Sequence, residues 1–396
     1  MSSSDQLSLL LRYTDNVVPE DELARKLELG RPLRVKLGLD PTAPSVTLGW
    51  AVVLRKLRQF QELGHTAVLI VGDFTAQVGD PSDRSSTRKR LTQEEVDVYA
   101  EAVLGQFRKV LLDENLEVRH NSEWLATLDM PGMLELTSSA TVAQMLERGD
   151  FAKRYRDGAP ISVMEFLYPL LQGYDSVAVE ADVELGGSDQ LWNLMMGRVV
   201  QERYGQKPQV ALTMPLLVGT DGVNKMSQSL GNYIGVTDAP DEMFGKTMSI
   251  PDGLMGQWFR LAADLDPEEV EEIETALAEG RLHPNQAKRR LAREVVALYW
   301  GEEAAEEAEQ RFDQVFKRGE SPEEMEEVPL PEEDPVQLPR LIREAFGISG
   351  AEARRLLEQG AVRIDGEVVD QQEQPRAALA GRVLKVGKRR FARLVE

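Results

Sequence analysis

The first half of the chain alternates short apolar runs with longer amphipathic segments. Residues 35–39 and 67–73 are apolar runs of strand length. Residues 50–63 and 92–112 instead repeat apolar side chains at helical spacing. Strands that alternate with helices form parallel sheets covered on both faces. The pattern therefore predicts an α/β fold, with a parallel-sheet domain over residues 1–235.

Helical patterning replaces this alternation in two later segments. Residues 125–175 are mostly helical in pattern, which predicts a helical insertion within the sheet domain. One extended run leads into residues 185–190, and a second, over residues 210–217, feeds the glycine-bounded loop 219–231. The pattern is helical again beyond this loop, so we expect an α-helical domain over residues 236–320.

The last part of the chain has the pattern of a separate small domain. Prolines among acidic residues predict a stiff linker over residues 321–335. Residues 338–346 and 349–360 have helical patterns, and a capping box opens the second helix. An Asp-Gly pair within residues 362–369 is typical of a hairpin, and two short apolar runs follow it. Residues 336–396 are therefore predicted to form a small α+β domain.

Composition excludes several classes of protein. The chain has 396 residues, a net charge of −21, no cysteine and three histidines. Disulfides, zinc–thiolate sites and cysteine nucleophiles are excluded, and a histidine metal cluster is not expected, so we predict no bound metal. No apolar run approaches the roughly 20 residues of a membrane span, and no secretory signal opens the chain. We therefore expect a cytoplasmic protein without membrane contact.

The charge is unevenly distributed along the chain. Residues 336–396 carry 12 Lys/Arg against 8 Asp/Glu, whereas residues 302–334 carry 3 Lys/Arg against 14 Asp/Glu. A strongly acidic chain is a poor partner for nucleic acid, because phosphate contacts require Lys and Arg. A basic tail beside an acidic segment nevertheless indicates contact with nucleic acid. A solvated helix and linker explain the acidic part equally well.

One strand–turn–helix segment has the features of a phosphate-binding site. The apolar run 35–39 ends in Asp40-Pro41 and a turn, and the next helix is predicted to start near Gly49. The free N–H groups and the positive dipole end of such a helix favour phosphates. Further along, Asp80 precedes Arg84 and Arg88, whose guanidiniums would share one side of a helical turn and could hold a pyrophosphate. A solvated basic loop explains this second stretch as well.

Three further clusters combine polar groups with glycines or helical spacing. Tyr168, Gln172 and Asp175 would share one helix face, where a carboxylate is costly to bury unpaired. In the segment 186–190 the glycines allow close backbone approach, Asp189 suits a ribose hydroxyl, and Gln190 suits a carboxylate. The loop segment 225–229 reads Lys-Met-Ser-Gln-Ser.

In their order and separations, these segments resemble the signatures of the class I aminoacyl-tRNA synthetases, and in detail those of the tyrosyl-tRNA synthetase family. The resemblance runs from about residue 30 to the end. It implies a Rossmann-like catalytic domain, an α-helical domain on the anticodon side, and an S4-type RNA-binding domain at residues 336–396. It also implies a homodimer formed through the insertion near residues 125–175. The implied substrates are tRNA(Tyr), tyrosine and ATP with Mg²⁺, and no tightly bound cofactor is expected.

The resemblance also implies a role for each cluster. The residues expected to bind tyrosine are Asp80, Tyr168 and Gln172 at the ammonium group, Gln190 at the carboxylate, and Asp175 at the phenol. The residues expected to bind ATP are Gly38, Asp40, Gly49, Trp50, Gly187, Asp189, Lys225 and Ser227. The residues expected to act in catalysis, on the transferring phosphates, are Thr42, Thr47, Arg84, Arg88 and Lys225.

Four positions depart from the family's pattern. Thr47 and Trp50 stand where the first signature has histidines, and Gln228 stands for the second lysine of the loop. Met164 lies where close relatives often have His. Activation needs no protein nucleophile, because the substrate carboxylate attacks the α-phosphate and the enzyme supplies positioning and charge. The departures are therefore expected to slow the reaction rather than change it, with the indole of Trp50 placed to crowd the nucleotide.

Three functions remain open at this point. A tyrosine–tRNA ligase is favoured by the intact tyrosine cluster, by Lys225 and by the complete basic tail. A weakened paralogue that binds tyrosine or RNA as a regulator is favoured by Thr47, Trp50 and Gln228. An enzyme that activates tyrosine but passes it to an acceptor other than tRNA is disfavoured by the complete tail.

Overall fold

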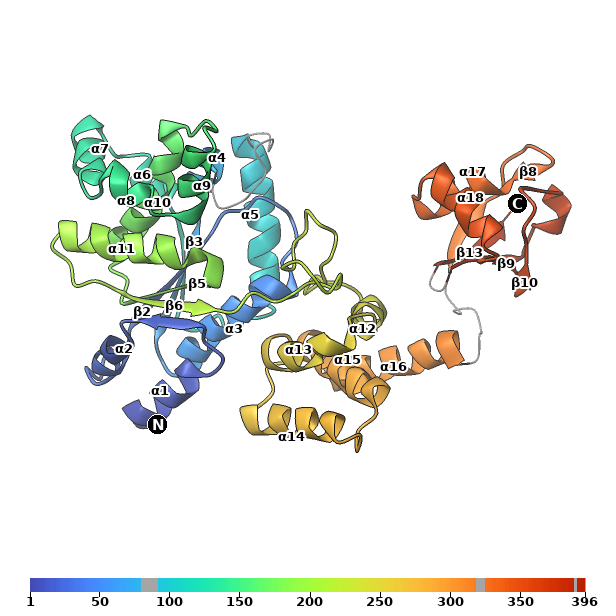
Figure 1. Cartoon of the computed structure of the whole chain (residues 1–396), viewed down its shortest axis with the longest axis horizontal. Coiled ribbons are helices and arrows are strands. Elements are labelled where there is room, and N and C mark those ends of the chain that lie inside the picture. The colour runs from blue at the N-terminus through green and yellow to red at the C-terminus, as the bar shows by residue number, and fades with distance from the viewer. Residues whose placement is uncertain (80–91, 318–324, 388–389, 396) are drawn as a thin grey trace. The chain divides into compact units, whose positions relative to one another are not determined.

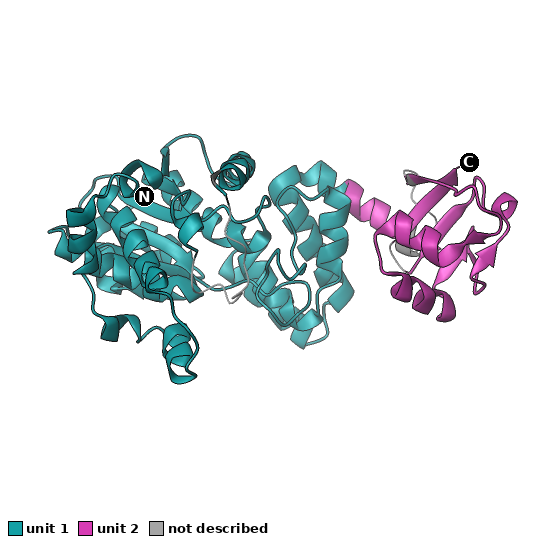
Figure 2. Cartoon of the chain, turned by 90° about the horizontal axis from the view of Figure 1, so that it is seen from above, with its two compact units in different colours: residues 1–306 teal, residues 307–396 magenta. Residues whose placement is uncertain are grey.

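The chain forms two compact units. The computed structural model describes residues 1–79, 92–317, 325–387 and 390–395. Unit 1 is Met1–Glu306 and unit 2 is Glu307–Glu396; Figure 2 shows them in different colours. Each unit has buried apolar side chains of its own.

Unit 1 is built around a mixed sheet. Its strands are β1 (Asn16–Val18), β2 (Arg34–Leu39), β3 (Thr66–Val71), β4 (Leu116–His120), β5 (Val183–Gly187) and β6 (Val210–Met214). Among the described residues these six strands lie in the order β1-β6-β5-β2-β3-β4 (Figure 1). β1 runs antiparallel to β6, and the other neighbours are parallel. The predicted α/β fold with a parallel central sheet is confirmed.

Helices pack on both faces of this sheet. Figure 1 shows α10 and α11 on one side, with α1 and α3 on the other. These helices and their neighbours are α1 (Ser3–Leu11), α2 (Glu20–Leu27), α3 (Leu48–Glu62), α4 (Thr75–Val78), α5 (Gln93–Phe107), α10 (Val163–Ala178) and α11 (Leu191–Arg203). The apolar stripe predicted for residues 50–63 faces the core, since Leu57 and Phe60 of α3 are fully buried. α5 ends before the predicted residue 112, because the amides of Lys109 and Val110 bond to carbonyls three residues back instead of four.

The strand order reverses between β2 and β5. The chain passes from β2 through α3 to β3 on one side, and it later returns through α10 to β5 on the other side. In sheets of this kind ligands bind beyond the carboxyl ends of the strands at the reversal point. Asp40 follows β2, and the short 3-10 helix η1 (Ser188–Gln190) follows β5. The fold therefore brings two of the predicted binding segments to the same edge.

A helical insertion stands between β4 and α10. It contains α6 (Ser122–Leu125), α7 (Met130–Thr137), α8 (Val142–Met145) and α9 (Gly149–Arg156). Leu136 and Met145 of the insertion share one buried cluster with Leu171 of α10 and Val200 of α11. The helical pattern predicted near residues 125–175 thus corresponds to helices packed against the sheet domain.

The helices that follow the sheet belong to unit 1. They are α12 (Pro240–Met248), the 3-10 helix η2 (Asp252–Leu254), α13 (Met255–Leu261), α14 (Pro267–Ala278) and α15 (Pro284–Trp300), and α16 (Glu302–Lys317) extends into unit 2. Arg12 of α1's C-cap pairs with Asp266 at 2.6 Å, and Arg55 of α3 donates to the Tyr299 hydroxyl at 2.7 Å. The sequence pattern predicts a separate domain over residues 236–320. In the structure these contacts join residues 236–306 to the sheet domain in one compact unit.

Unit 2 is a small α+β fold. Its elements are β7 (Glu326–Pro329), β8 (Val336–Gln337), α17 (Leu338–Phe346), α18 (Gly350–Glu358), β9 (Val362–Ile364), β10 (Glu367–Val368), β11 (Glu373–Gln374), the 3-10 helix η3 (Arg376–Ala378), β12 (Val383–Val386) and β13 (Arg390–Val395). Among the described residues five strands pair in the order β10-β9-β12-β13-β7, and β11 pairs with β8. Both predicted helices are present, and β9 and β10 form the predicted hairpin.

The segment predicted as a linker contributes a strand to unit 2. β7 lies within residues 321–335 and pairs in parallel with β13, with Val328 opposite Leu394. Val328 and Leu330 are buried in the core of unit 2. Because backbone pairing and apolar burial hold this strand, the prediction of a linker up to residue 335 needs correction: the folded part begins before residue 336.

Candidate active site

A large cleft opens at the carboxyl edge of the sheet in unit 1. Its volume is about 1540 Å³, above the roughly 300–1,000 Å³ of ordinary small-molecule sites. The predicted site residues that line it are Gly38, Asp40, Thr42, Thr47, Gly49, Trp50, Tyr168, Gln172, Asp175, Gly187, Asp189, Gln190, Lys225 and Ser227. Asp80, Arg84 and Arg88 lie outside the described residues. The structure thus brings together every predicted site residue that it describes.

The end of β2 holds a fixed carboxylate. Thr75 donates from its hydroxyl to Oδ1 of Asp40 at 2.7 Å, and the Tyr168 hydroxyl donates to Oδ2 of Asp40 at 2.9 Å. Gly72 leaves room for this arrangement, since a Cβ there would lie 2.1 Å from Asp40 Oδ1. Asp40 and Tyr168 therefore form one ordered wall of the cleft.

Asp175 lies buried at another part of the cleft. Trp124 donates from Nε1 to its Oδ1 at 2.8 Å, and Asn121 donates from Nδ2 to its Oδ2 at 3.3 Å. Burial raises the pKa of Asp175 to about 7, against the smaller lowering effects of Lys36 and of these two hydrogen bonds. An ionised carboxylate has about four acceptor positions, so Asp175 can accept a further bond from a ligand hydroxyl.

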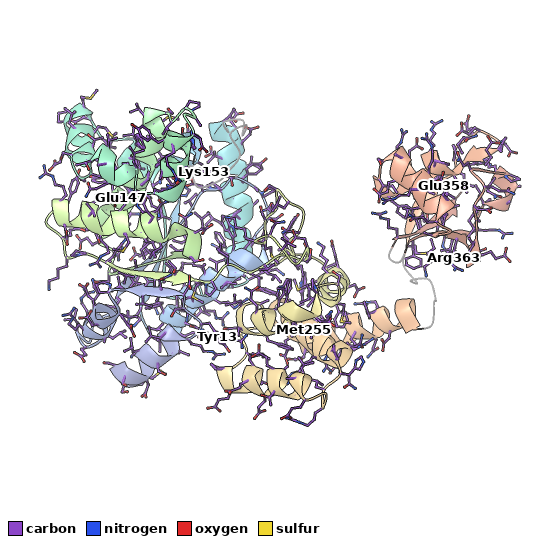
Figure 3. All side chains as sticks on the ribbon, viewed as in Figure 1. Tyr13, Glu147, Lys153, Met255, Glu358 and Arg363 are labelled. Atoms are coloured by element: carbon purple, nitrogen blue, oxygen red, sulfur yellow. The ribbon has the colours of Figure 1, made fainter. Side chains whose placement is uncertain are left out.

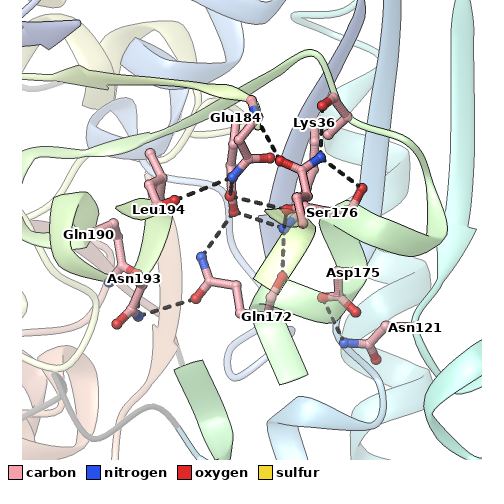
Figure 4. A network of polar contacts seen from close by, with 12 residues as sticks. Lys36, Asn121, Gln172, Asp175, Ser176, Glu184, Gln190, Asn193 and Leu194 are labelled. Atoms are coloured by element: carbon pink, nitrogen blue, oxygen red, sulfur yellow. Dashed lines mark hydrogen bonds and ion pairs between the residues drawn. The ribbon is translucent and has the colours of Figure 1, made fainter. Parts of the chain in front are cut away.

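Two side-chain amides, those of Gln172 and Gln190, also line the cleft. Asn193 donates from Nδ2 to the side-chain oxygens of both, at 3.1 Å each (Figure 4). Gln172 in turn donates to Glu184, which forms a buried ion pair with Lys36 at 2.8 Å. The two predicted amino-acid ligands therefore belong to one connected network.

The first turn of α3 faces the cleft. Thr47 is the N-cap, and its hydroxyl accepts from the backbone amide of Trp50 at 3.4 Å. Gly49 packs against Met226 of the loop that follows β6, where a Cβ would come within 3.4 Å of Met226 Cβ. The indole of Trp50 is 39% exposed and lines the cleft. A helix N-terminus is therefore available here for an anion.

The loop 219–231 is docked onto this helix start. Lys225 pairs with Asp189 at 2.7 Å, and the backbone amide of Ser227 donates to Asn232 at 2.8 Å. Gln228 donates from its side chain to the carbonyl oxygen of Ser45. The predicted lysine is thus held at the predicted ribose-binding carboxylate.

Several residues that line the cleft or support its side chains are not predicted from the sequence. Asn121 and Trp124, which hold Asp175, come from the start of the insertion and carry no local signal. Lys153 and Arg154 of α9 also line the cleft (Figure 3 labels Lys153). Lys36 and Glu184 have a detectable signal, because each is a charged residue inside an apolar strand.

Two other kinds of feature are not found in the part of the chain that the structure describes. No group of three or more His, Cys, Asp or Glu side chains there could hold a metal ion. Over the same residues, no helix is both long enough and apolar enough to cross a membrane.

The arrangement suits a small ligand that has both a hydroxyl and an amino-acid group, next to a nucleotide. Asp175 is a buried acceptor for the hydroxyl, and the amides of Gln172 and Gln190 can bind an ammonium and a carboxylate. The N-terminus of α3 and Lys225 provide positive potential for phosphates. Such a site can bring a carboxylate against a nucleotide phosphate.

Comparison with known proteins identifies the class. Residues 28–317 match the family model of the tRNA synthetases class I (W and Y), and residues 338–375 match that of the S4 domain. The chain therefore belongs to the class I tRNA synthetases. Two relatives that are similar over nearly the full length of the chain are tyrosine–tRNA ligases. That of Moorella thermoacetica is 53% identical over 394 residues, covering 98% of this chain and 95% of the relative. That of Thermotoga maritima is 48% identical, over 100% of this chain and 98% of the relative.

Solved structures agree on the fold. The tyrosyl-tRNA synthetase of Archaeoglobus fulgidus, complexed with L-tyrosine, matches with a TM-score of 0.63 and 25% identity, over 78% of this chain and 99% of that chain. A C-terminally truncated mitochondrial tyrosyl-tRNA synthetase of Aspergillus nidulans matches with a TM-score of 0.65 and 21% identity, over 80% of this chain and 94% of that chain. The second likeness bears on the fold alone.

Proposed function

We propose that the chain is a tyrosine–tRNA ligase. Tyrosine and ATP give tyrosyl-adenylate and pyrophosphate, and the tyrosyl group then passes to the 3′ end of tRNA(Tyr). The observation that carries this proposal is the buried Asp175, which keeps acceptor capacity in the same cleft as the N-terminus of α3 and Lys225. Relatives with this activity, similar over the whole chain, support it.

In this proposal tyrosine lies with its phenol at Asp175. Tyr168 and Gln172 bind the ammonium group together with Asp80, and Gln190 binds the carboxylate. The phenol of tyrosine donates to Asp175, which Trp124 and Asn121 already orient. Phenylalanine would leave this desolvated carboxyl group without its ligand partner, which disfavours its binding.

ATP enters as its Mg²⁺ complex and binds as a substrate. Asp189 accepts from the ribose, and Gly187 allows close approach of the nucleotide. The residues assigned to the rest of ATP are Gly38, Asp40, Gly49, Trp50 and Ser227. The tyrosine carboxylate attacks the α-phosphate, and the bond to the leaving pyrophosphate breaks. Charge on the phosphates is stabilised by Thr42, Thr47, Lys225, Arg84 and Arg88.

The proposal also assigns RNA-binding parts and an assembly. Residues 336–396 bind tRNA(Tyr) through their basic side chains, and residues 236–320 lie on the anticodon side. The insertion forms a homodimer contact in the cytoplasm. Support for the contact comes from large apolar side chains exposed on and beside it, as expected of an interface. These are Met130, Leu134, Val142, Tyr155 and Val163.

A second function is favoured by three particular side chains. Thr47, Trp50 and Gln228 replace groups that stabilise phosphate charge in the family, and the Thr47 hydroxyl is already engaged in capping α3. A paralogue with these features would bind tyrosine or RNA and regulate rather than activate. It would keep the tyrosine site and lack turnover.

Pyrophosphate exchange separates the two functions. The ligase exchanges labelled pyrophosphate into ATP when tyrosine is present and not when phenylalanine replaces it. Lys225→Ala should reduce this exchange by about 10²–10³-fold, because one preorganised charge is lost. If calorimetry shows tyrosine binding but no exchange occurs, the ligase is contradicted and the regulator is supported. The absence of both tyrosine binding and exchange would also contradict the proposal.

A further inference from the structure

The orientation of the amides in the cleft is set by groups that can act only as donors or only as acceptors. A primary amide presents an oxygen acceptor on one side and an NH₂ donor on the other, so it can bind in two opposite orientations. Gln172, Gln190 and Asn193 form a connected set of three amides (Figure 4). Fixing one of them fixes the others by hydrogen-bond complementarity.

Arg148, in the insertion, fixes one end of this set. Its guanidinium donates to Oδ1 of Asn193 at 3.0 Å, and both side chains are buried. A guanidinium has no acceptor, so Asn193 must turn its oxygen toward Arg148 and its Nδ2 away. That Nδ2 donates to the oxygens of Gln172 and Gln190, each at 3.1 Å.

The ion pair of Lys36 and Glu184 fixes the other end. Lys36 is 0% exposed, and its three protons are matched by Glu184, the carbonyl oxygen of Gln172 and the Ser176 hydroxyl, each at 2.8 Å. The carboxylate of Glu184 can only accept hydrogen bonds, and it accepts one from Nε2 of Gln172 at 3.1 Å. Both ends of the set therefore demand the same orientation of Gln172.

We propose that Asn193, oriented by Arg148, is a positioning residue that holds Gln190 in the orientation that binds the carboxylate end of the amino acid, while Glu184 holds Gln172. This inference rests on the proposed function and adds the origin of the polarity of its amino-acid site. Because Asn193 donates to Oε1 of Gln190, the Nε2 donor of Gln190 points away from Asn193, and this orientation suits a ligand carboxylate. Gln172 keeps an acceptor lone pair on Oε1, which suits an ammonium group.

Reversing the donor at position 193 should affect one end of the ligand. Asn193→Asp keeps the size of the side chain and can still accept from Arg148, but it cannot donate to Gln190 or to Gln172. The negative charge instead attracts Nε2 of Gln190 and turns its oxygen toward the ligand carboxylate. Gln172 is still held by Glu184 through its own Nε2. The loss should therefore depend on the carboxylate.

The test measures binding of tyrosine and of tyramine, which lacks the carboxylate, to the full-length chain by calorimetry. Asn193→Asp should weaken tyrosine binding at least about tenfold and change tyramine binding less than about twofold, because a bond to a charged group is lost only in the first case. Asn193→Ala removes the donation without adding a charge, so its loss for tyrosine should be smaller, about threefold. Asn121→Asp, a matched change beside Asp175, should weaken both ligands alike.

The order of the two variants at position 193 separates positioning from packing. A packing role would make Asn193→Ala, which leaves a cavity, at least as harmful as the isosteric Asn193→Asp. That order, or equal weakening of tyrosine and tyramine by Asn193→Asp, overturns the inference and leaves the proposed function intact. If Asn193→Asp does not fold, the tyrosine-to-tyramine ratio in Asn193→Ala decides the same question. Failure of the unaltered chain to bind tyrosine overturns the proposed function, and this inference with it.

Discussion

Single side chains in the cleft are held by partners that burial makes necessary. Asp175 illustrates this, because a carboxyl group in an apolar environment is costly to ionise unless donors surround it. Trp124 and Asn121 supply two donors, and the pKa still rises to about 7. The carboxyl group is therefore sensitive both to a ligand hydroxyl and to pH.

Amino-acid choice should depend on Asp175. Asp175→Ala should weaken tyrosine binding by roughly 10–100-fold, the usual effect of losing a hydrogen bond to a charged group, and relax the rejection of phenylalanine, which then leaves no desolvated carboxyl group unpaired. Calorimetry with both amino acids at pH 8, where Asp175 is ionised, measures this. Asp182→Asn changes another buried aspartate that does not line the cleft, and it should leave the preference unaltered. Unchanged tyrosine affinity in Asp175→Ala would contradict the assignment.

The raised pKa of Asp175 predicts a pH dependence of stability. The folded chain keeps the proton up to about pH 7, whereas the unfolded chain loses it near the ordinary value of 3.8. Between these values the folded state binds more protons, so Asp175 lowers the free energy of unfolding as pH rises, by as much as about 4 kcal/mol. Asp175→Asn should remove this part of the slope between pH 4 and pH 7 in chemical denaturation. Parallel curves for both proteins would contradict it.

At the level of elements, the start of α3 and the loop 219–231 act as one surface for phosphates. Two backbone bonds join the start of α3 to the residues just after the loop, from the amide of Leu48 to Ile234 at 2.8 Å and from the amide of Val236 to Val46 at 2.9 Å. Gln228 adds a side-chain contact to Ser45. The departures at Thr47, Trp50 and Gln228 therefore lie on one joint surface.

Restoring the family's groups on this surface should raise the rate of activation. In the triple variant Thr47→His, Trp50→His, Gln228→Lys, added donors meet charge that develops mainly in the transition state. Single-turnover formation of tyrosyl-adenylate should be faster by about 10²-fold or more, since that is the usual effect of a single preorganised donor. Tyrosine affinity should change little. Equal rates in the two proteins would mean that other groups, such as Lys225, already perform this role.

β7 should be needed for the stability of unit 2. A fragment of residues 325–396 contains β7, whereas a fragment of residues 336–396 loses its pairing with β13 and the buried Val328 and Leu330. Burial of two such side chains contributes roughly 3 kcal/mol, so the longer fragment should have the higher denaturant midpoint. Val368→Ala in the longer fragment, at a side chain 51% exposed, should change the midpoint little. Equal midpoints would restore the boundary at residue 336.

At the scale of the whole molecule, activation and RNA binding are assigned to different units. The cleft lies within unit 1, and unit 2 has its own sheet and core. The net charge of −21 makes the chain as a whole a poor partner for RNA, so binding should depend on the basic residues 336–396.

Removal of residues 325–396 should therefore separate the two half-reactions. Pyrophosphate exchange with tyrosine should remain close to that of the full chain, while charging of tRNA(Tyr) should fall at least about tenfold. Binding of tRNA to the full chain should weaken as salt rises, because counterions released from the phosphates drive it. Loss of exchange in the shortened chain would show instead that unit 2 supports the catalytic fold.

The sequence by itself determined the local elements and their order. Periodicity over 50–63 predicted α3, and the apolar runs predicted β2 and β3, because backbone spacing and side-chain burial repeat within a few residues. The signatures also predicted which residues would line one cleft, and the described ones do. These patterns can be recognised in the sequence because each one lies within one short segment.

Only the tertiary structure decided which distant residues support that cleft. Lys36 and Glu184 are 148 positions apart in the chain and meet because β2 and β5 are neighbours at the strand reversal. Asn121 reaches Asp175 from the insertion, and Arg148 sets the orientation of Asn193. β7 joins a sheet whose partner strand is more than 60 residues later. These contacts depend on packing between elements, and no pattern within one segment encodes it.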